Sequence, residues 1–227
     1  MTELVFAVFV FLATHAIPAA KPVRAALVGR LGERVYLVAY SVLSVATVVW
    51  LGVAYARAPY LEIWPLAAWT RWLPLLVMPF ACIFLVAALI SPNPLSIGGR
   101  SRGFDAARPG IAAVTRHPLI WAFVLWAAAH IPANGDVASL ILFGLLLALS
   151  LIGPLSLDAK RRAALGDEQW RHLAHATSGF PFMAIISGRA RLRLREIGPW
   201  PIIGGLLLYV LLILLHAPLI GVSPLPM

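Results

Sequence analysis

"TRHPLIWAFVLWAAAHIPANGD", residues 115–136, is an apolar segment with a histidine at each end and an Asn-Gly-Asp sequence after it. A helix rises about 1.5 Å and turns about 100° per residue. His117 and His130 would therefore lie roughly 20 Å apart along such a helix and about 140° apart around it. One straight helix cannot bring both imidazoles to the same metal ion. We expect Asn134-Gly135-Asp136 to form a tight turn, because Asn-Gly sequences tolerate positive φ.

The composition around this segment is that of a membrane protein. Hydrophobic residues make up 61% of the chain and charged residues 12%, and the mean hydropathy is +0.90. A bilayer core about 30 Å thick needs about 20 mainly apolar residues per helix. The sequence predicts an all-α, polytopic transmembrane bundle of about six helices, surrounded by the lipid bilayer. Its expected spans are 4–20, 35–56, 72–90, 117–133, 137–157 and 200–220.

The net charge of +9 is distributed as in an integral membrane protein. Sixteen of the 18 Lys and Arg residues fall in the loops after the first, third and fifth predicted helices. Only Arg57 and Arg71 lie in the loop after the second. Positively charged loops stay cytoplasmic. We therefore expect a multi-pass protein of the bacterial inner (cytoplasmic) membrane with both termini periplasmic. The basic charge then serves topology and contact with anionic lipid, and we expect no nucleic-acid partner.

The polar stretch after residue 157 suggests a division of the chain. Residues 158–175 can form a polar helix with one apolar side, and "FPFMAII" (180–186) is apolar enough to enter the inner interface. We predict a membrane domain over residues 1–190, with five transmembrane helices and this cytoplasmic amphipathic segment. Residues 191–227 would be a basic linker and a C-terminal transmembrane helix. Cys82 is the only cysteine, which excludes an intramolecular disulfide.

Three of the six histidines are candidates for function. His172 and His175 belong to the charged loop and His216 to a helix end, where histidine costs little. His15, His117 and His130 fall in or beside apolar segments, where ionisable groups are costly and tend to face a cavity or a ligand. Neutral imidazole is also a common metal ligand. From the residues alone, three roles stay open for these histidines: a proton relay, metal or heme ligands, or packed helix-end residues.

The same residues resemble a known family. "RHPLIWAFVLWAAAHIPANGD" (116–136) is similar to the RHP/GHP…LW…AH…ANGD signature of the NnrU family of bacterial membrane proteins. His15 matches that family's early histidine. "LDAKRRAALGDEQWRHLAHATSGFPFMAIISGR" (157–189) is similar to its closing pattern of Trp, Thr-Ser, Pro-Phe and Gly-Arg. The resemblance is collinear from about residue 3 to residue 190.

The resemblance implies a function in denitrification or a heme-dependent activity. NnrU-like proteins are associated with the expression or maturation of nitrite and nitric oxide reductases, which would be partner enzymes. The superfamily also includes the 15-cis-zeta-carotene isomerase, which binds heme b through two histidines. Carried over by motif, the axial ligands of the heme iron would be His15 and His130, with His117 supporting or gating the cofactor site. Ala127 stands where the isomerase pattern has a cysteine.

The topology favours a different ligand pair from the motif. By helix rise, His15 and His130 differ by roughly 10 Å in depth, whereas His15 and His117 both fall near the inner leaflet. A tilted helix, or a heme standing across the leaflets, would reconcile His15 with His130. Because the motif is the more specific observation, we predict His15 and His130 as ligands and keep His15 with His117 as the alternative.

A second resemblance gives an alternative function. "RHPLI" followed by "GDEQWRHLAHATSGFPF" is similar to a pattern of the membrane isoprenylcysteine carboxyl methyltransferases, although Ile120 stands where they have tyrosine. This implies S-adenosylmethionine as cofactor, in an inner pocket lined by Arg116, His117, Glu168 and Trp170. A third hypothesis is a non-enzymatic assembly factor for respiratory complexes, so the sequence leaves open whether the protein is an enzyme.

Overall fold

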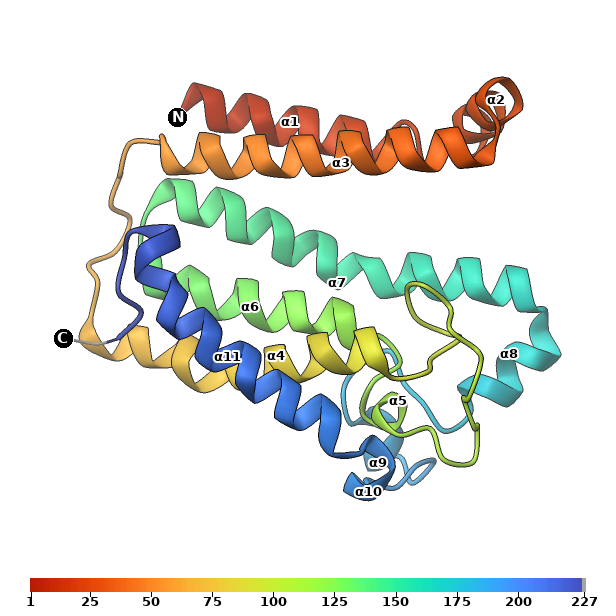
Figure 1. Cartoon of the computed structure of the whole chain (residues 1–227). Helices are drawn as coiled ribbons and strands as arrows, with labels where there is room; N and C mark the ends of the chain where they lie inside the picture. Colours follow the sequence, from red (N-terminus) through yellow and green to blue (C-terminus); the bar gives the residue numbers. More distant parts are fainter. Residues whose placement is uncertain (226–227) are drawn as a thin grey trace. The chain divides into compact units, whose positions relative to one another are not determined.

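Apolar runs long enough to cross a bilayer form the longest helices of the computed structural model, which describes residues 1–225 (Figure 1). Four helical segments qualify by length and hydropathy: α3 (Glu33–Ala56), the short 3-10 helix η1 (Ala68–Arg71) with α4 (Trp72–Ile90), α7 (Val137–Leu165) and α11 (Pro199–Ile220). A fifth is the pair α1 (Thr2–Ala16) and α2 (Lys21–Leu31), bent by 72°, if the two count as one span. The described residues form no β-strand, which confirms the predicted all-α membrane class.

The helices group into two units. The first contains Met1–Pro65 and Gly135–Leu142. The second contains Leu66–Asn134 and the residues from Phe143 onward. Besides η1, α4, α11 and most of α7, the second unit holds α6 and four short helices. Their bounds are α5 (Ile111–Val114), α6 (Pro118–Asn134), α8 (Asp167–Ala174), α9 (Met183–Ile186) and α10 (Leu194–Ile197).

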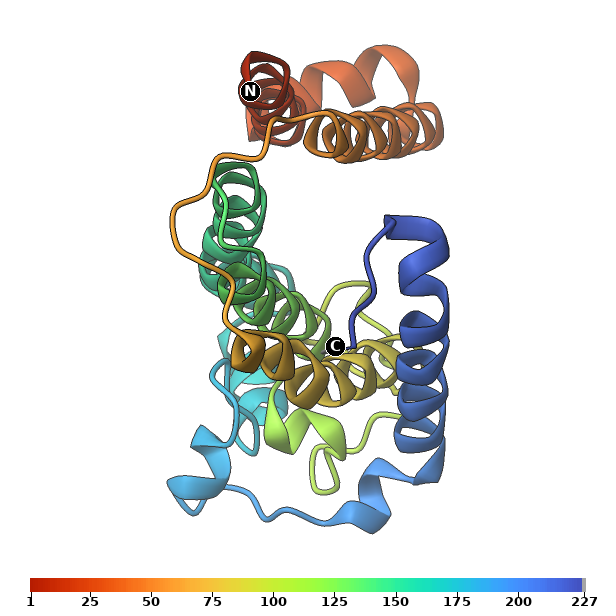
Figure 2. The same cartoon turned by 90° about the vertical axis from the view of Figure 1, so that its left-hand side faces the viewer.

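In the first unit, α1 and α3 lie side by side (Figures 1 and 2). Small and branched side chains fill their contact, and Leu4 and Ala54 are almost fully buried. The end of α1 is held by tyrosines of α3, because the hydroxyl of Tyr40 donates to the carbonyl of His15 (3.3 Å) and that of Tyr36 to Pro18 (3.0 Å). These hydroxyls satisfy carbonyls that a helix end leaves without partners.

Of two local predictions, the end of the first helix is wrong and the turn before α7 is confirmed. The first span was expected over residues 4–20, but α1 ends at Ala16. Pro18 has no amide to continue the helical hydrogen bonds. The expected turn at 134–136 forms, with Gly135 at φ 70°, and Asp136 then accepts a hydrogen bond from the amide of Ser139 (3.0 Å) at the start of α7.

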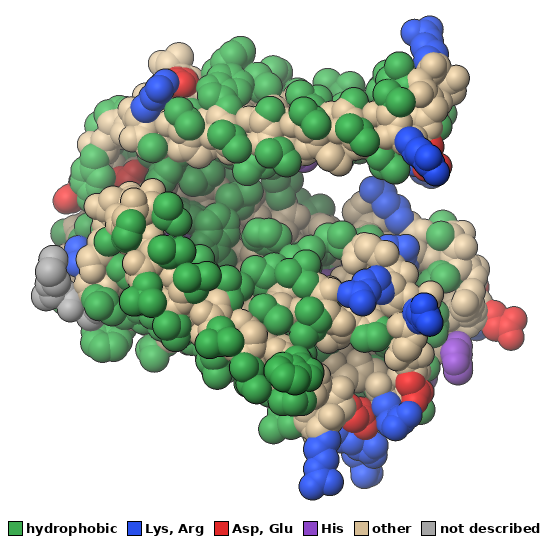
Figure 3. Space-filling model, in the orientation of Figure 1, with side chains coloured by type: hydrophobic (Ala, Val, Ile, Leu, Met, Phe, Trp, Pro, Cys, Tyr) green, Lys and Arg blue, Asp and Glu red, His purple; other side chains and the backbone are tan. Residues whose placement is uncertain are grey.

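In the second unit, α4 packs between α6 and α11 (Figures 1 and 2). Gly205 permits the close approach of α11, because a Cβ there would lie 2.5 Å from the Cα of Ile83. The lipid-facing side of α11 is apolar, as Leu207 (65% exposed) and Leu214 (67%) illustrate. Hydrophobic side chains accordingly cover this helix in Figure 3.

The polar stretch after residue 157 is divided between two helices. A helix was predicted over residues 158–175, but α7 continues through Leu165 and a separate helix, α8, follows. Gly166 separates them, with a φ of 80° that favours glycine. The continuation of α7 carries Asp158 on the same helix as the apolar span.

One side-chain hydrogen bond ties α11 to α4. Pro79 lies inside α4 and has no amide, so the carbonyl of Leu75, four residues earlier, lacks its helical donor. The hydroxyl of Tyr209 on α11 donates to this carbonyl (2.9 Å). The carbonyl that Pro79 leaves without a donor in α4 thereby becomes an attachment point for α11.

Tyr209→Phe should lower the stability of the protein in detergent by about 1 kcal/mol, since interhelical hydrogen bonds in membranes contribute about this much. For a chain of this size that is a fall in Tm of roughly 2–4 °C, measured by circular dichroism. In a Pro79→Ala background Leu75 regains an amide donor, so the same substitution should cost clearly less. Equal losses in both backgrounds would show that the hydroxyl does not act through this carbonyl.

Candidate functional site

A buried charge cluster, defined as Arg116, His117 and Asp158, lies where α6 begins. The side chain of His117 is fully buried, and its Nε2–H donates to Oδ1 of Asp158 (2.8 Å). A carboxylate only accepts, so the proton of a neutral imidazole is held on Nε2. Nδ1 then carries a lone pair, and it is buried with no hydrogen-bond partner among residues 1–225.

Arg116 completes this cluster. Its Nε lies 3.5 Å from Oδ2 of Asp158, and its guanidinium lies over the ring of Trp170 on α8 (5.3 Å to the centroid). Burial lowers the pKa of Arg116, and the negative charge of Asp158 partly offsets that effect. Arginine stays protonated despite such shifts. One carboxylate therefore faces both the guanidinium of Arg116 and the imidazole of His117.

Hydrogen bonds from the loop after α4 and to the loop before α9 fix the backbone around the buried charge cluster. Asn93, after α4, donates from its side chain to the carbonyl of Arg116 (3.0 Å). The hydroxyl of Thr115 and the indole N–H of Trp121 both donate to the carbonyl of Gly179 (3.2 and 2.7 Å). The Arg-His-Pro sequence is thus joined to the loop before α9 and cannot move independently of it.

His130 lies near the other end of α6. Its Nδ1–H donates to the carbonyl of Trp126, one helical turn earlier (2.7 Å). The imidazole stacks on the ring of Phe143 (centroids 5.2 Å apart, 26° between planes) and is tilted against the ring of Trp126 (5.8 Å). The ring orientation is therefore set by one hydrogen bond and two aromatic neighbours.

His15 in α1 repeats this arrangement. Its Nδ1–H donates to the carbonyl of Phe11, again one turn earlier (2.8 Å). The rings of Phe11 and Tyr40 lie beside the imidazole, with centroids 4.2 and 6.2 Å away. His15 belongs to the first unit, and His117 and His130 belong to the second. The pairing of His15 with either of them stays a prediction.

The hydrogen bonds of His15 and His130 suit metal ligation. With Nδ1 protonated, neutral imidazole presents an unprotonated Nε2. Metal-bound histidines typically donate their other ring N–H to a carbonyl or carboxylate, which fixes the tautomer and orients the ring. Among residues 1–225 no three His, Cys, Asp or Glu side chains gather as a metal-ion site. A heme iron needs only two axial side chains, and the donor chemistry of His15 and His130 fits that requirement.

The structure brings together only some of the residues expected to line a methyltransferase pocket. Arg116 and Trp170 are in contact, whereas Glu168 is exposed on α8. The carboxylate beside Arg116 is that of Asp158, a residue that was not predicted to belong to the site. The signal that could have identified it is an acidic side chain directly after a long apolar run.

Comparison with known proteins adds one finding. The family model described as NnrU protein matches residues 3–224, nearly the whole chain. No curated protein and no solved structure gives a significant match.

Asp158→Ala should destabilise the protein strongly, because it leaves the buried Arg116 without a counter-charge and His117 Nε2 without an acceptor. Breaking a buried pair costs about 3–5 kcal/mol, and the partial exposure of Asp158 (27%) reduces this to roughly 2 kcal/mol. We expect a fall in Tm of about 4–8 °C in a thermal melt followed by circular dichroism.

The matched control is Asp167→Ala. Asp167 pairs with Arg162 (2.6 Å), but the two side chains are 62% and 56% exposed. Exposed ion pairs contribute little to stability. A Tm loss in Asp167→Ala as large as in Asp158→Ala would contradict the special role of the buried charge cluster.

Proposed function

The chain belongs to the NnrU family, and we propose that it is a multi-pass membrane protein that binds heme b with His15 and His130 as axial ligands. The observation that carries this proposal is the matched hydrogen bonding of the two imidazoles. Each donates Nδ1–H to the carbonyl four residues earlier, and each thereby presents Nε2.

The surroundings of the two histidines support the same proposal. Both imidazoles lie in apolar helices against aromatic rings, in surroundings of the kind that favour a large, flat, apolar cofactor. Axial ligands and burial tune the redox potential of a bound heme, which supplies one-electron chemistry. The protein contributes two oriented nitrogen donors, low polarity around them and protection from water.

We propose two roles for such a protein from its family membership. One is the expression or maturation of nitrite and nitric oxide reductases in denitrification, in the inner membrane. The other is a heme-dependent isomerase-like activity. In both, His117 would support or gate the cofactor site, oriented by the bond of its Nε2–H to Asp158.

Absorption spectroscopy of the detergent-purified protein, expressed with ample heme, tests the proposal directly. We expect a Soret band and, after dithionite reduction, sharp α and β bands. His15→Ala and His130→Ala should each lose most of the bound heme, measured as heme per protein chain. A colourless wild-type protein would sink the proposal.

His216→Ala is the matched control for these variants. The Nδ1–H of His216 donates to the carbonyl of Val222 (2.7 Å), so this histidine presents the same tautomer at the end of α11. Heme content should be unchanged in His216→Ala and in His117→Ala. If His117→Ala loses heme while His130→Ala keeps it, the ligand pair is His15 with His117. Circular dichroism of each variant separates ligand loss from unfolding.

A second candidate function is methyl transfer from S-adenosylmethionine at the end of the protein where α6 begins. The observation that favours it is the contact of Arg116 with Trp170, two residues expected in that pocket. An arginine stacked on an indole beside a carboxylate offers groups for the carboxylate and adenine of this cofactor.

Equilibrium dialysis of the purified protein against radiolabelled S-adenosylmethionine distinguishes this candidate. Binding that Arg116→Ala weakens, and that exposed Arg162→Ala leaves intact, would support methyl transfer. Removing a charge-assisted contact should weaken binding by about tenfold or more. Absence of binding to the wild-type protein eliminates the candidate.

A further inference from the structure

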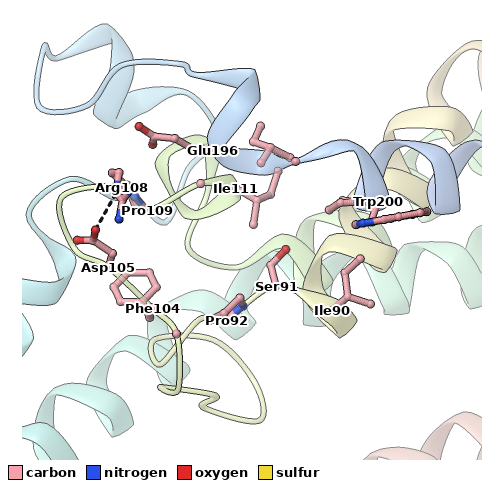
Figure 4. A pocket seen from close by; sticks show the side chains of 15 residues that line it. Ile90, Ser91, Pro92, Phe104, Asp105, Arg108, Pro109, Ile111, Glu196 and Trp200 are labelled. Carbon is pink, nitrogen blue, oxygen red and sulfur yellow. Dashed lines mark hydrogen bonds and ion pairs between the residues drawn. The ribbon is translucent and has the colours of Figure 1, made fainter.

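A cavity of about 410 Å³ lies in the second unit where α4 ends and α11 begins (Figure 4). Three segments form its wall: the end of α4 with the residues after it, the loop that leads into α5, and the segment from α10 into α11. Neither the proposed heme ligands nor the buried charge cluster contributes to it.

The wall of this cavity changes character from one side to the other. Ile90 at the end of α4 and Trp200 at the start of α11 form an apolar side, and both are exposed (44% and 71%). The opposite side carries the ion pair of Asp105 with Arg108 (2.9 Å) and the carboxylate of Glu196, as Figure 4 shows. The apolar side continues the lipid-facing surface of two membrane helices. A molecule that fits both sides is an amphiphile lying at the membrane interface.

The side chains in and next to this cavity carry an excess of positive charge, which favours an anionic headgroup. A second cavity of about 210 Å³ shares Pro109 and Glu196 with the first, and Arg189, Arg191 and Arg193 line it. The linings of the two cavities together hold four arginines against two carboxylates. Lys and Arg side chains also gather over this end of the second unit in Figure 3.

The arginines of the second cavity differ in what they already bind. Arg189 donates to the carbonyls of His175 and Thr177 (2.8 and 3.0 Å), so it holds the loop together. Arg193 pairs with Glu196 (3.0 Å). Arg191 is exposed and makes no ion pair or hydrogen bond within the described chain. Arg191 is therefore the cation left for an external anion, with Arg193 beside it.

We propose that the two cavities together bind one anionic phospholipid, whose phosphate pairs with Arg191 and Arg193 and whose acyl chains lie against Ile90 and Trp200. Three features of the molecule support this assignment: the apolar side at the ends of two membrane helices, the excess of arginine and the unpaired guanidinium of Arg191. Basic pockets beside transmembrane helices bind anionic headgroups in this way. This inference does not depend on heme or on S-adenosylmethionine.

Lipid binding to the delipidated full-length protein in detergent, followed by native mass spectrometry, tests the proposal. The probes are phosphatidylglycerol and phosphatidylcholine with identical acyl chains. Phosphatidylglycerol should bind about tenfold more tightly or better, and the double variant Arg191→Gln with Arg193→Gln should lose that preference. Equal affinity of the wild-type protein for both lipids would overturn the proposal.

Arg30→Gln with Arg34→Gln is the matched control, because it removes the same charge from exposed residues that line neither cavity. It should retain the preference for phosphatidylglycerol. An equal loss in this control would reduce the effect to general surface charge. Glycerol 3-phosphate, added at the concentration at which phosphatidylglycerol saturates the protein, should not displace the lipid. Displacement of the lipid would identify the ligand as a soluble phosphate. Circular dichroism confirms that both double variants are folded.

Discussion

Inside a bilayer, a carbonyl that loses its helical amide has no water to replace it, and this constraint explains the main polar contacts between the apolar helices. Pro79 deprives the carbonyl of Leu75 of its donor, and Tyr209 supplies a hydroxyl from the neighbouring helix. At the end of α1, Tyr36 and Tyr40 supply hydroxyls to two further carbonyls. Each defect in a helix thus becomes a specific attachment point for another one.

The same constraint acts on charged side chains. Arg116 and His117 are drawn into the protein because Asp158 gives both a partner, and the cost of their burial is offset only while the cluster is complete. Neighbouring loops close over the cluster and satisfy its backbone, as the contacts of Asn93 and Trp121 show. These contacts join the cluster to the loop after α4 and to the loop before α9.

Sequence periodicity and hydropathy predicted the class of the fold but not its contacts. The apolar runs at 35–56, 72–90 and 200–220 closely match α3, α4 and α11, because hydrophobic length alone determines a membrane span. The helix α2, the extension of α7 and the early end of α1 were missed. Those boundaries depend on single glycines and prolines and on partners distant in sequence. Asp158 was missed for the same reason, since it lies 41 residues from its partner His117.

The C-terminal helix illustrates what a sequence pattern leaves out. As a leucine-rich run after a basic linker, residues 191–227 were predicted to form a separate anchor, and the boundary at 190 stays a prediction. In the structure, α11 approaches α4 closely at Gly205, and Tyr209 donates to the carbonyl of Leu75. The family match also extends to residue 224. Glu196 and Trp200 further line the larger cavity, so this segment contributes a wall to it. A helix that fills a packing groove, satisfies a neighbour's carbonyl and forms a cavity does more than hold the chain in lipid.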